Sequence, residues 1–228
     1  MTSPVTQAVL FDIDGTLLDF HQAGKRAFSL ALAEQFGWVD DLSYIQFAGA
    51  TDLDVIRRIC THHDHPCSPA IEAAFFETLP RHLTRTAASS HVTVFPGVRS
   101  LLTELERDAG SAVGLVTGNI EACARIKLKQ AGLEGSFTVG AFGHEHADRV
   151  SITRLALDRV RAHAHLPHDC RAFLIGDTPA DMHAAAVIGL GGIGVATGHY
   201  SVGDLQEAGA SLAVENLSDP SVRKWLGL

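Results

Sequence analysis

Two carboxylates stand together near the start of the chain, where Asp12 and Asp14 directly follow the apolar run 8–11. In extended chain, residues i and i+2 point to the same side. Like charges this close repel and raise one pKa unless a cation neutralises them. Mg²⁺ prefers oxygen ligands and often binds through one or two carboxylates and a substrate phosphate. The pair therefore predicts a magnesium and phosphate site, although Asp-rich turns also cap helices.

Polar residues also follow two later apolar runs. The first set is Thr117, Gly118 and Asn119, and the second is Asp177, Thr178 and Asp181. Either set could simply cap the helix that follows it. Ligands of open parallel sheets, however, bind at the carboxyl ends of the strands. We therefore predict that the three segments meet in one site.

The elements that must position these residues can be read from the hydrophobic pattern. Short continuous apolar runs predict strands buried on both faces, at 8–11, 112–116, 137–139, 172–175 and 193–196. Helical spacing lies between most of them, as at 98–105 and 152–160. This alternation predicts an α/β fold with a parallel sheet between two layers of helices.

The interval 19–91 breaks this alternation, because no strand pattern is visible there. Two helical stripes are visible instead, formed by Ala23, Ala27, Leu30 and Ala31 and by Ile71, Ala74, Phe75 and Leu79. We predict an inserted helical unit.

The motifs and this organisation resemble the haloacid dehalogenase-like (HAD) hydrolase superfamily. The first motif is the string 12–17, Asp-Ile-Asp-Gly-Thr-Leu, and the segment 47–52 is similar to the specificity loop of phosphoglycolate phosphatase-like members. The resemblance implies a doubly wound, Rossmann-like core domain at 1–18 and 92–228. It also implies an all-helical cap domain at 19–91, between the first and second motifs.

The resemblance also implies roles for the motif residues. Asp12 would be the nucleophile that forms an aspartyl-phosphate, and Asp14 the general acid and base. A Mg²⁺ ion would be held by Asp12, the main-chain carbonyl of Asp14, and Asp177, with Asp181 nearby or as a further ligand. The implied phosphate-binding residues are Gly15, Thr16, Thr117, Gly118 and Asn119. The implied activity is Mg²⁺-dependent hydrolysis of a small phosphorylated metabolite.

The third motif departs from the family pattern, because the region 143–150 has no lysine. Arg149 is the natural substitute, since its guanidinium can pair with a carboxylate and a phosphate oxygen. If Arg149 faces water, Lys127 or Lys129 could serve, although both lie within a helical stripe.

Other activities stay open. A phosphosugar mutase would keep both aspartates, and a catalytically idle binding protein would fit the missing lysine. A phosphonatase would need a cap lysine, and Lys25 is the one lysine of the interval 19–91. The candidates for substrate specificity are Lys25, Thr51 and Arg57, although surface exposure is the default for each.

Composition excludes several other classes. The 228 residues carry a net charge of −8 without a basic block, which disfavours nucleic acid and anionic membranes as partners.

Residues 1–7 lack the pattern of a signal peptide, and no apolar run is long enough to span a bilayer. The four cysteines form no Cys-x-x-Cys pair, and the histidines at 62, 63 and 65 match no zinc pattern. We expect a cytoplasmic monomer or homodimer.

Overall fold

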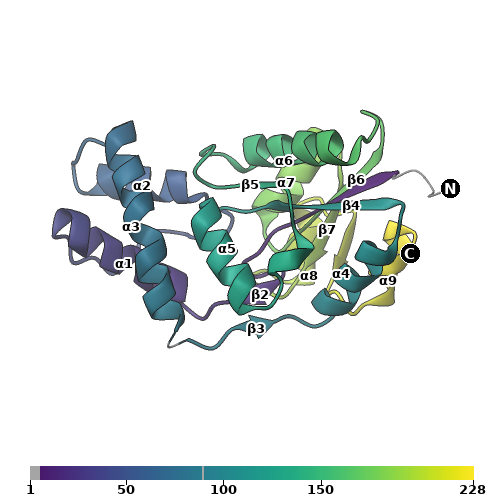
Figure 1. Ribbon diagram of the computed structural model, residues 1–228, viewed down its shortest axis with the longest axis horizontal. Helices are drawn as coiled ribbons and strands as arrows, with labels where there is room; N and C mark the ends of the chain where they lie inside the picture. The colour runs from purple at the N-terminus through teal and green to yellow at the C-terminus, as the bar shows by residue number, and fades with distance from the viewer. Residues whose placement is uncertain (1–5, 89) are drawn as a thin grey trace.

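A six-stranded parallel sheet forms the centre of the molecule in the computed structural model, which describes residues 6–88 and 90–228. The strand order is β5-β4-β1-β6-β7-β8, with helices on both faces of the sheet (Figure 1). The strands are β1 (Gln7–Phe11), β4 (Ser111–Val116), β5 (Gly140–Ala141), β6 (Arg171–Gly176), β7 (Gly191–Val195) and β8 (Leu212–Val214). The predicted doubly wound α/β fold is confirmed.

The central strand β1 is buried on both faces, as its continuous apolar run predicts. Ala8 and Leu10 pack into the cluster that includes α6 (Arg149–Ala164) and α7 (Pro179–Ile188). Val9 and Phe11 belong to the cluster on the opposite face, with α4 (Val98–Arg107) and α5 (Glu121–Gln130). Because β1 pairs with β4 on one side and β6 on the other, the ends of these three strands lie next to one another.

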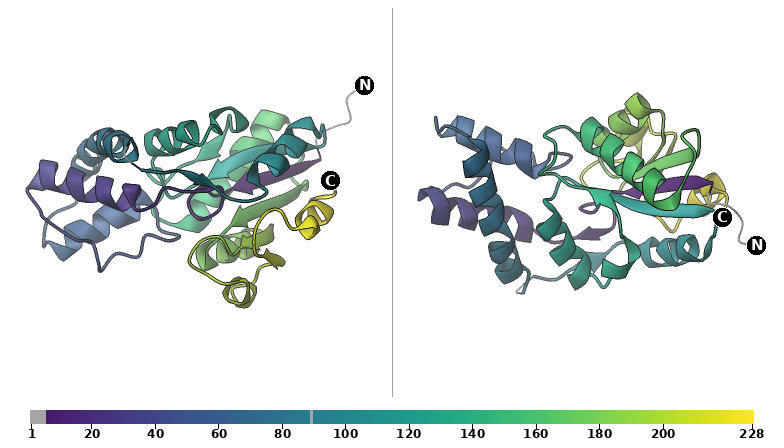
Figure 2. Two further views of the ribbon diagram at one scale, coloured as in Figure 1. Left: turned by 90° about the horizontal axis from the view of Figure 1, so that it is seen from below. Right: turned by 45° about the horizontal axis from the view of Figure 1, so that its top comes forward.

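Three helices form a separate group beyond the carboxyl ends of the strands (Figures 1 and 2). They are α1 (Ala23–Phe36), α2 (Asp52–His62) and α3 (Pro69–Ala87). The chain enters and leaves this group through a two-stranded antiparallel pair, β2 (Leu18–Asp19) and β3 (Thr93–Val94). This arrangement is consistent with a helical cap. The division at 18/19 and 91/92 stays a proposal, and residues 1–5 and 89 lie outside the described part of the chain.

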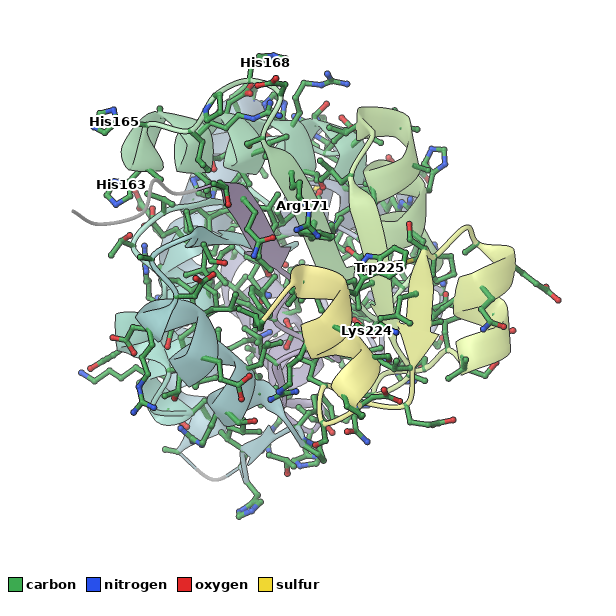
Figure 3. All side chains as sticks on the ribbon, turned by 90° about the vertical axis from the view of Figure 1, so that its right-hand side faces the viewer. His163, His165, His168, Arg171, Lys224 and Trp225 are labelled. Atoms are coloured by element: carbon green, nitrogen blue, oxygen red, sulfur yellow. The ribbon has the colours of Figure 1, made fainter. Side chains whose placement is uncertain are left out.

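The opposite end of the sheet is closed by α9 (Pro220–Leu226), which follows α8 (Val202–Glu207) and β8. Arg171 begins β6 and lies beside α9, where its Nη2 donates to the carbonyl of Trp225 at 3.0 Å (Figure 3). Gln7 Nε2 donates to the carbonyl of Leu226 at 3.0 Å. The first strand and the last helix are thus joined at the end of the sheet that faces away from the helical group.

Some local predictions are wrong. The strand expected at 137–139 lies at Gly140–Ala141, because Phe137 turns into the core and packs edge-to-face on Phe11 with ring centroids 5.8 Å apart. Leu30 and Ala74 lie in helices, as the two stripes predict, but their side chains are exposed.

The histidine-rich segment 62–65 has a structural explanation. His63 stacks on Trp38 with ring centroids 4.1 Å apart, and its Nε2 lies 2.8 Å from Asp40 Oδ2. Within the described ranges, the groups of His, Cys, Asp and Glu that could hold a metal ion do not include these histidines. Among the described helices, none combines the length and the apolar character needed to cross a membrane.

Candidate active site

The ends of β1, β4 and β6 face a cavity of about 610 Å³ between the sheet and the three-helix group. Its lining includes residues from all three strand ends and from the segment 45–52 that leads into α2. The predicted convergence is therefore present. The core residues at the cavity are Asp12, Asp14, Gly15, Thr117, Gly118, Asn119, Lys127, Arg149, Asp177, Thr178 and Thr197–Tyr200.

Three buried carboxylates form the floor of this site. Asp12, Asp177 and Asp181 each place one oxygen within 4.8 Å of the others, and their exposed fractions are 7%, 3% and 0%. Asp181 is held by the start of its own helix, because its Oδ2 accepts hydrogen bonds from the Thr178 amide at 3.1 Å and the Thr178 hydroxyl at 2.6 Å. Thr178 is the N-cap of α7, because its hydroxyl in turn accepts from the Asp181 amide.

Arg149 supplies positive charge to this floor. Its Nη2 lies 2.8 Å from Asp12 Oδ1, and its Nε donates to Asp181 Oδ1 at 2.7 Å. Arg149 is the first residue of α6, and Asp148 caps that helix by accepting from the Ser151 amide. A side chain at this position points back over the strand ends, which brings the buried guanidinium to the two carboxylates. Arg149 therefore lies beside Asp12, where the sequence placed a substitute for the absent lysine.

One arginine does not balance three carboxylates. Burial raises the pKa of Asp12 to about 7, with Arg149 acting in the opposite direction and Asp181 adding to the rise. Burial, together with Asp12 and Asp181, also raises the pKa of Asp177 well above its usual value. A donor set of oxygen atoms with excess negative charge fits a hard divalent cation such as Mg²⁺.

The turn after β1 packs against Asp177. Gly15 has φ +80°, and a Cβ there would lie 2.2 Å from Asp177 Oδ2, so only glycine fits this turn. The Gly15 amide donates to the carbonyl of Leu18 and the Thr16 amide to that of Ile13, while the Thr16 hydroxyl donates to Asp177 Oδ1 at 3.1 Å. These two residues, for which phosphate binding stays a prediction, hold the turn and contact Asp177.

Asp14 lies in a second group of polar residues. Its carboxylate oxygens are 2.7 and 2.6 Å from Lys127 Nζ, and Asn119 Nδ2 donates to Asp14 Oδ2 at 2.6 Å. Asn119 also donates to the hydroxyl of buried Thr117 at 2.8 Å. The sequence points to Lys127 only as an alternative to Arg149 in replacing the third-motif lysine. Its place among the core-facing residues Cys123, Ala124 and Leu128 of α5 was the signal that it needs a buried partner.

The helical group is docked on the core through the start of α2. The Asp52 amide donates to the carbonyl of Gly118 at 2.7 Å, and Asp52 Oδ2 accepts from the Ile120 amide at 2.7 Å. A Cβ on Gly118 would lie 2.0 Å from the carbonyl of Ala50, so this contact leaves no room for a side chain. The N-cap of α5 is therefore Ile120, whose amide donates to Asp52, so the alternative that Thr117 or Asn119 caps this helix is wrong. Burial raises the pKa of Asp52 to about 7.

The three candidates for specificity are separated by the fold. Lys25 lines the cavity, whereas Thr51 and Arg57 are absent from its lining. Thr51 is buried as the N-cap of α2 and its hydroxyl donates to the carbonyl of Ala147 at 3.0 Å. Arg57 pairs with Glu72 at 2.6 Å within the helical group. The cavity wall also contains a contact that sequence reasoning missed, where Gln46 Nε2 donates to the hydroxyl of Tyr200 at 2.8 Å.

Known proteins match this chain along most of its length. Curated relatives include phosphoglycolate phosphatases from Synechococcus elongatus, 27% identical over 93% of this chain and 94% of the relative, and from Rhodospirillum rubrum, 27% identical over 97% and 91%. The resemblance to the phosphoglycolate phosphatase-like group is thereby confirmed.

Solved structures share the fold. A hydrolase from Pseudomonas syringae has a TM-score of 0.71 at 20% identity, covering 97% of this chain and 98% of that one. A CbbY protein from Rhodobacter sphaeroides, solved in complex with phosphate, has a TM-score of 0.71 at 23% identity, with 94% and 96% covered. The family model of haloacid dehalogenase-like hydrolases matches residues 9–195, and the chain belongs to that family.

Proposed function

We propose that this protein is a Mg²⁺-dependent phosphomonoester hydrolase that forms an aspartyl-phosphate on Asp12. One observation carries the proposal. The buried carboxylates of Asp12, Asp177 and Asp181, whose charge one arginine does not balance, form a cluster at a cavity of about 610 Å³. The names of the curated relatives support a phosphatase and make 2-phosphoglycolate the first small substrate to test.

The metal site in this proposal uses side chains of the floor. Asp12 and Asp177 would hold the ion together with the main-chain carbonyl of Asp14, and Asp181 would hold Arg149 or reach the ion itself. When bound, Mg²⁺ would neutralise the carboxylates and the charge of the phosphoryl oxygens. Arg149 keeps Asp12 fixed and offsets part of its charge.

The reaction then follows from the two aspartates. The Asp12 carboxylate attacks phosphorus, and the bond to the leaving oxygen breaks as Asp14 transfers a proton to that oxygen. Asp14 next takes a proton from water, whose oxygen attacks the same phosphorus. The bond between phosphorus and Asp12 breaks, which releases inorganic phosphate and restores the carboxylate. In this proposal Thr117, Gly118 and Asn119, which line the cavity, would bind the phosphoryl oxygens.

The test is phosphate release from p-nitrophenyl phosphate and a panel of phosphate esters, with Mg²⁺ and with a chelator. We expect turnover that requires the metal, and loss of at least about a thousandfold in Asp12→Asn, because the amide is not a nucleophile. Asp158→Asn, a change of an exposed carboxylate on α6, is the matched control and should retain activity.

Two results would contradict the proposal. Absence of turnover with every divalent cation would favour an idle binding protein. Interconversion of sugar phosphates without release of inorganic phosphate would favour a mutase.

A further inference from the structure

Lys127 is a buried cation that the proposed chemistry does not use. It is 5% exposed, on the core-facing side of α5, and a lysine in such a place is costly unless it is paired. Its Nζ donates to both oxygens of Asp14, at 2.7 and 2.6 Å, and to Asn119 Oδ1 at 2.7 Å. All three protons of the ammonium group thus have acceptors nearby.

Asn119 completes this arrangement with a fixed orientation. Its amide oxygen faces Lys127, which can only donate, and its amide nitrogen faces Asp14 Oδ2 at 2.6 Å, which accepts. The same nitrogen donates to the Thr117 hydroxyl at 2.8 Å. Lys127, Asn119 and Asp14 therefore form a closed triangle of hydrogen bonds. Each bond joins a donor to an acceptor: Lys127 only donates, Asp14 only accepts, and Asn119 does both.

Asp14 depends on this triangle for its position. Its side chain is 44% exposed at the cavity, so little packing holds it. Short hydrogen bonds to a charged donor are the stronger kind, and two donors, Lys127 within α5 and Asn119 just before it, restrict both torsions of the aspartate.

Lys127 and Arg149 divide the two aspartates of the first motif between them. Arg149 contacts Asp12 and Asp181 from the start of α6, whereas Lys127 contacts Asp14 from the middle of α5. The two cations thus pair with different carboxylates, and Lys127 does not add a second positive charge next to Asp12.

We propose that Lys127 is the positioning residue of Asp14, acting with Asn119 to hold its carboxyl group toward the leaving oxygen of the substrate. This inference rests on the proposed hydrolase function. Lys127 acts through Asp14, so its loss should affect the steps in which Asp14 moves a proton.

The dependence on the leaving group separates this role from a merely structural one. An alkoxide leaves only if it is protonated, whereas p-nitrophenolate leaves readily without a proton. The ratio kcat/KM reports all steps up to cleavage of the ester bond. General acid catalysis contributes about a hundredfold to ten-thousandfold, so a misplaced acid should slow alkyl esters far more than aryl esters.

The experiment compares an alkyl phosphate substrate with p-nitrophenyl phosphate in Lys127→Met and in the control Lys129→Met, which changes an exposed lysine of the same helix. In Lys127→Met we expect kcat/KM to fall by about thirtyfold or more for the alkyl ester and by less than about fivefold for the aryl ester. Lys129→Met should match the wild type with both. Equal losses with the two esters, or no loss, would overturn the proposal.

A double-mutant cycle with Asp14→Asn tests whether Lys127 acts through Asp14. We expect Lys127→Met to change the alkyl-ester rate of Asp14→Asn by less than about twofold, because its effect is already lost. Additive losses would contradict the inference. The double variant carries no unpaired charge at this position, so we expect it to fold. If melting curves show that Lys127→Met is unfolded, Lys127→Gln takes its place in the cycle. If the wild type hydrolyses no phosphate ester, the proposed function fails and the inference fails with it. If it does and the leaving-group ratio is unchanged, only the inference fails.

Discussion

The two walls of the cavity are built differently. On the core wall, Asp12, Asp177 and Asp181 are less than one-tenth exposed, and each is held by hydrogen bonds or ion pairs from a strand end or a helix start. On the cap wall, Lys25 is partly exposed and Gln46 is exposed. Buried, paired groups on rigid elements suit chemistry that needs fixed geometry, whereas exposed side chains suit a surface that can change with the substrate.

A third region joins the two walls. The start of α2 docks on the 118–120 segment through main-chain groups and the Asp52 carboxylate. Main-chain contacts constrain the cap more tightly than surface side chains would, because a backbone group has no rotamer to change. We therefore expect large effects for changes in the core wall, intermediate effects at the docking contact and small effects on the cap wall.

After the loss of Asp12, the largest effect on hydrolysis of p-nitrophenyl phosphate should come from the guanidinium of the core wall. Arg149→Ala leaves Asp12 and Asp181 without their cation, and we expect kcat/KM for p-nitrophenyl phosphate to fall at least about tenfold. Breaking a buried ion pair should also lower the free energy of unfolding by about 3 kcal/mol, as measured by denaturant titration. Arg154→Ala, which changes an exposed arginine of the same helix, is the control. A loss of less than twofold would place Arg149 outside the reaction.

An intermediate, pH-dependent effect should come from the docking contact. Burial raises the pKa of Asp52 to about 7, so between about pH 4 and pH 7 the folded state holds a proton that the unfolded state has lost. The contribution of Asp52 to stability therefore falls as pH rises through this window. The side chain in Asp52→Asn is uncharged at every pH. We therefore expect its melting temperature to exceed that of the wild type by about 2–4 °C at pH 8, and the difference to disappear toward pH 4.

The control for this measurement is Asp54→Asn, two residues further along α2, where Asp54 forms an ion pair with Arg58 at 2.8 Å. Its melting temperature should keep the pH dependence of the wild type. Parallel curves for Asp52→Asn and the wild type would show that Asp52 is not a neutral group at this contact.

The smallest effects should come from the cap. Lys25→Ala removes a cation at the cavity, so we expect KM for an anionic phosphate ester to rise by about threefold to tenfold with kcat nearly unchanged. Arg57→Ala should leave KM within about twofold, since Arg57 pairs with Glu72 away from the cavity lining. A larger rise in KM for Arg57→Ala than for Lys25→Ala would reverse the assignment of the two residues.

Much of the core could be predicted because each central strand carries its own signal. The apolar runs before Asp12, Thr117 and Asp177 mark strands buried on both faces, and parallel pairing brings their ends together. The signal fails where a strand is very short, as at Gly140–Ala141, and for β8, which the pattern did not mark. Two or three paired residues leave too little periodicity to read.

The chain itself determined which residue types meet at the strand ends, since strand order and burial follow from hydrophobic pattern. Only the tertiary structure decided which cation serves which carboxylate. Arg149 and Lys127 are 22 positions apart on two helices that cover opposite faces of the sheet, and the side chain that reaches Asp12 depends on where each helix begins above the strands. Thr51 and Arg57 likewise look available in sequence, but docking and a local ion pair occupy them. These ion pairs and hydrogen bonds join segments that are far apart in the sequence, so the spacing of residues within one segment does not predict them.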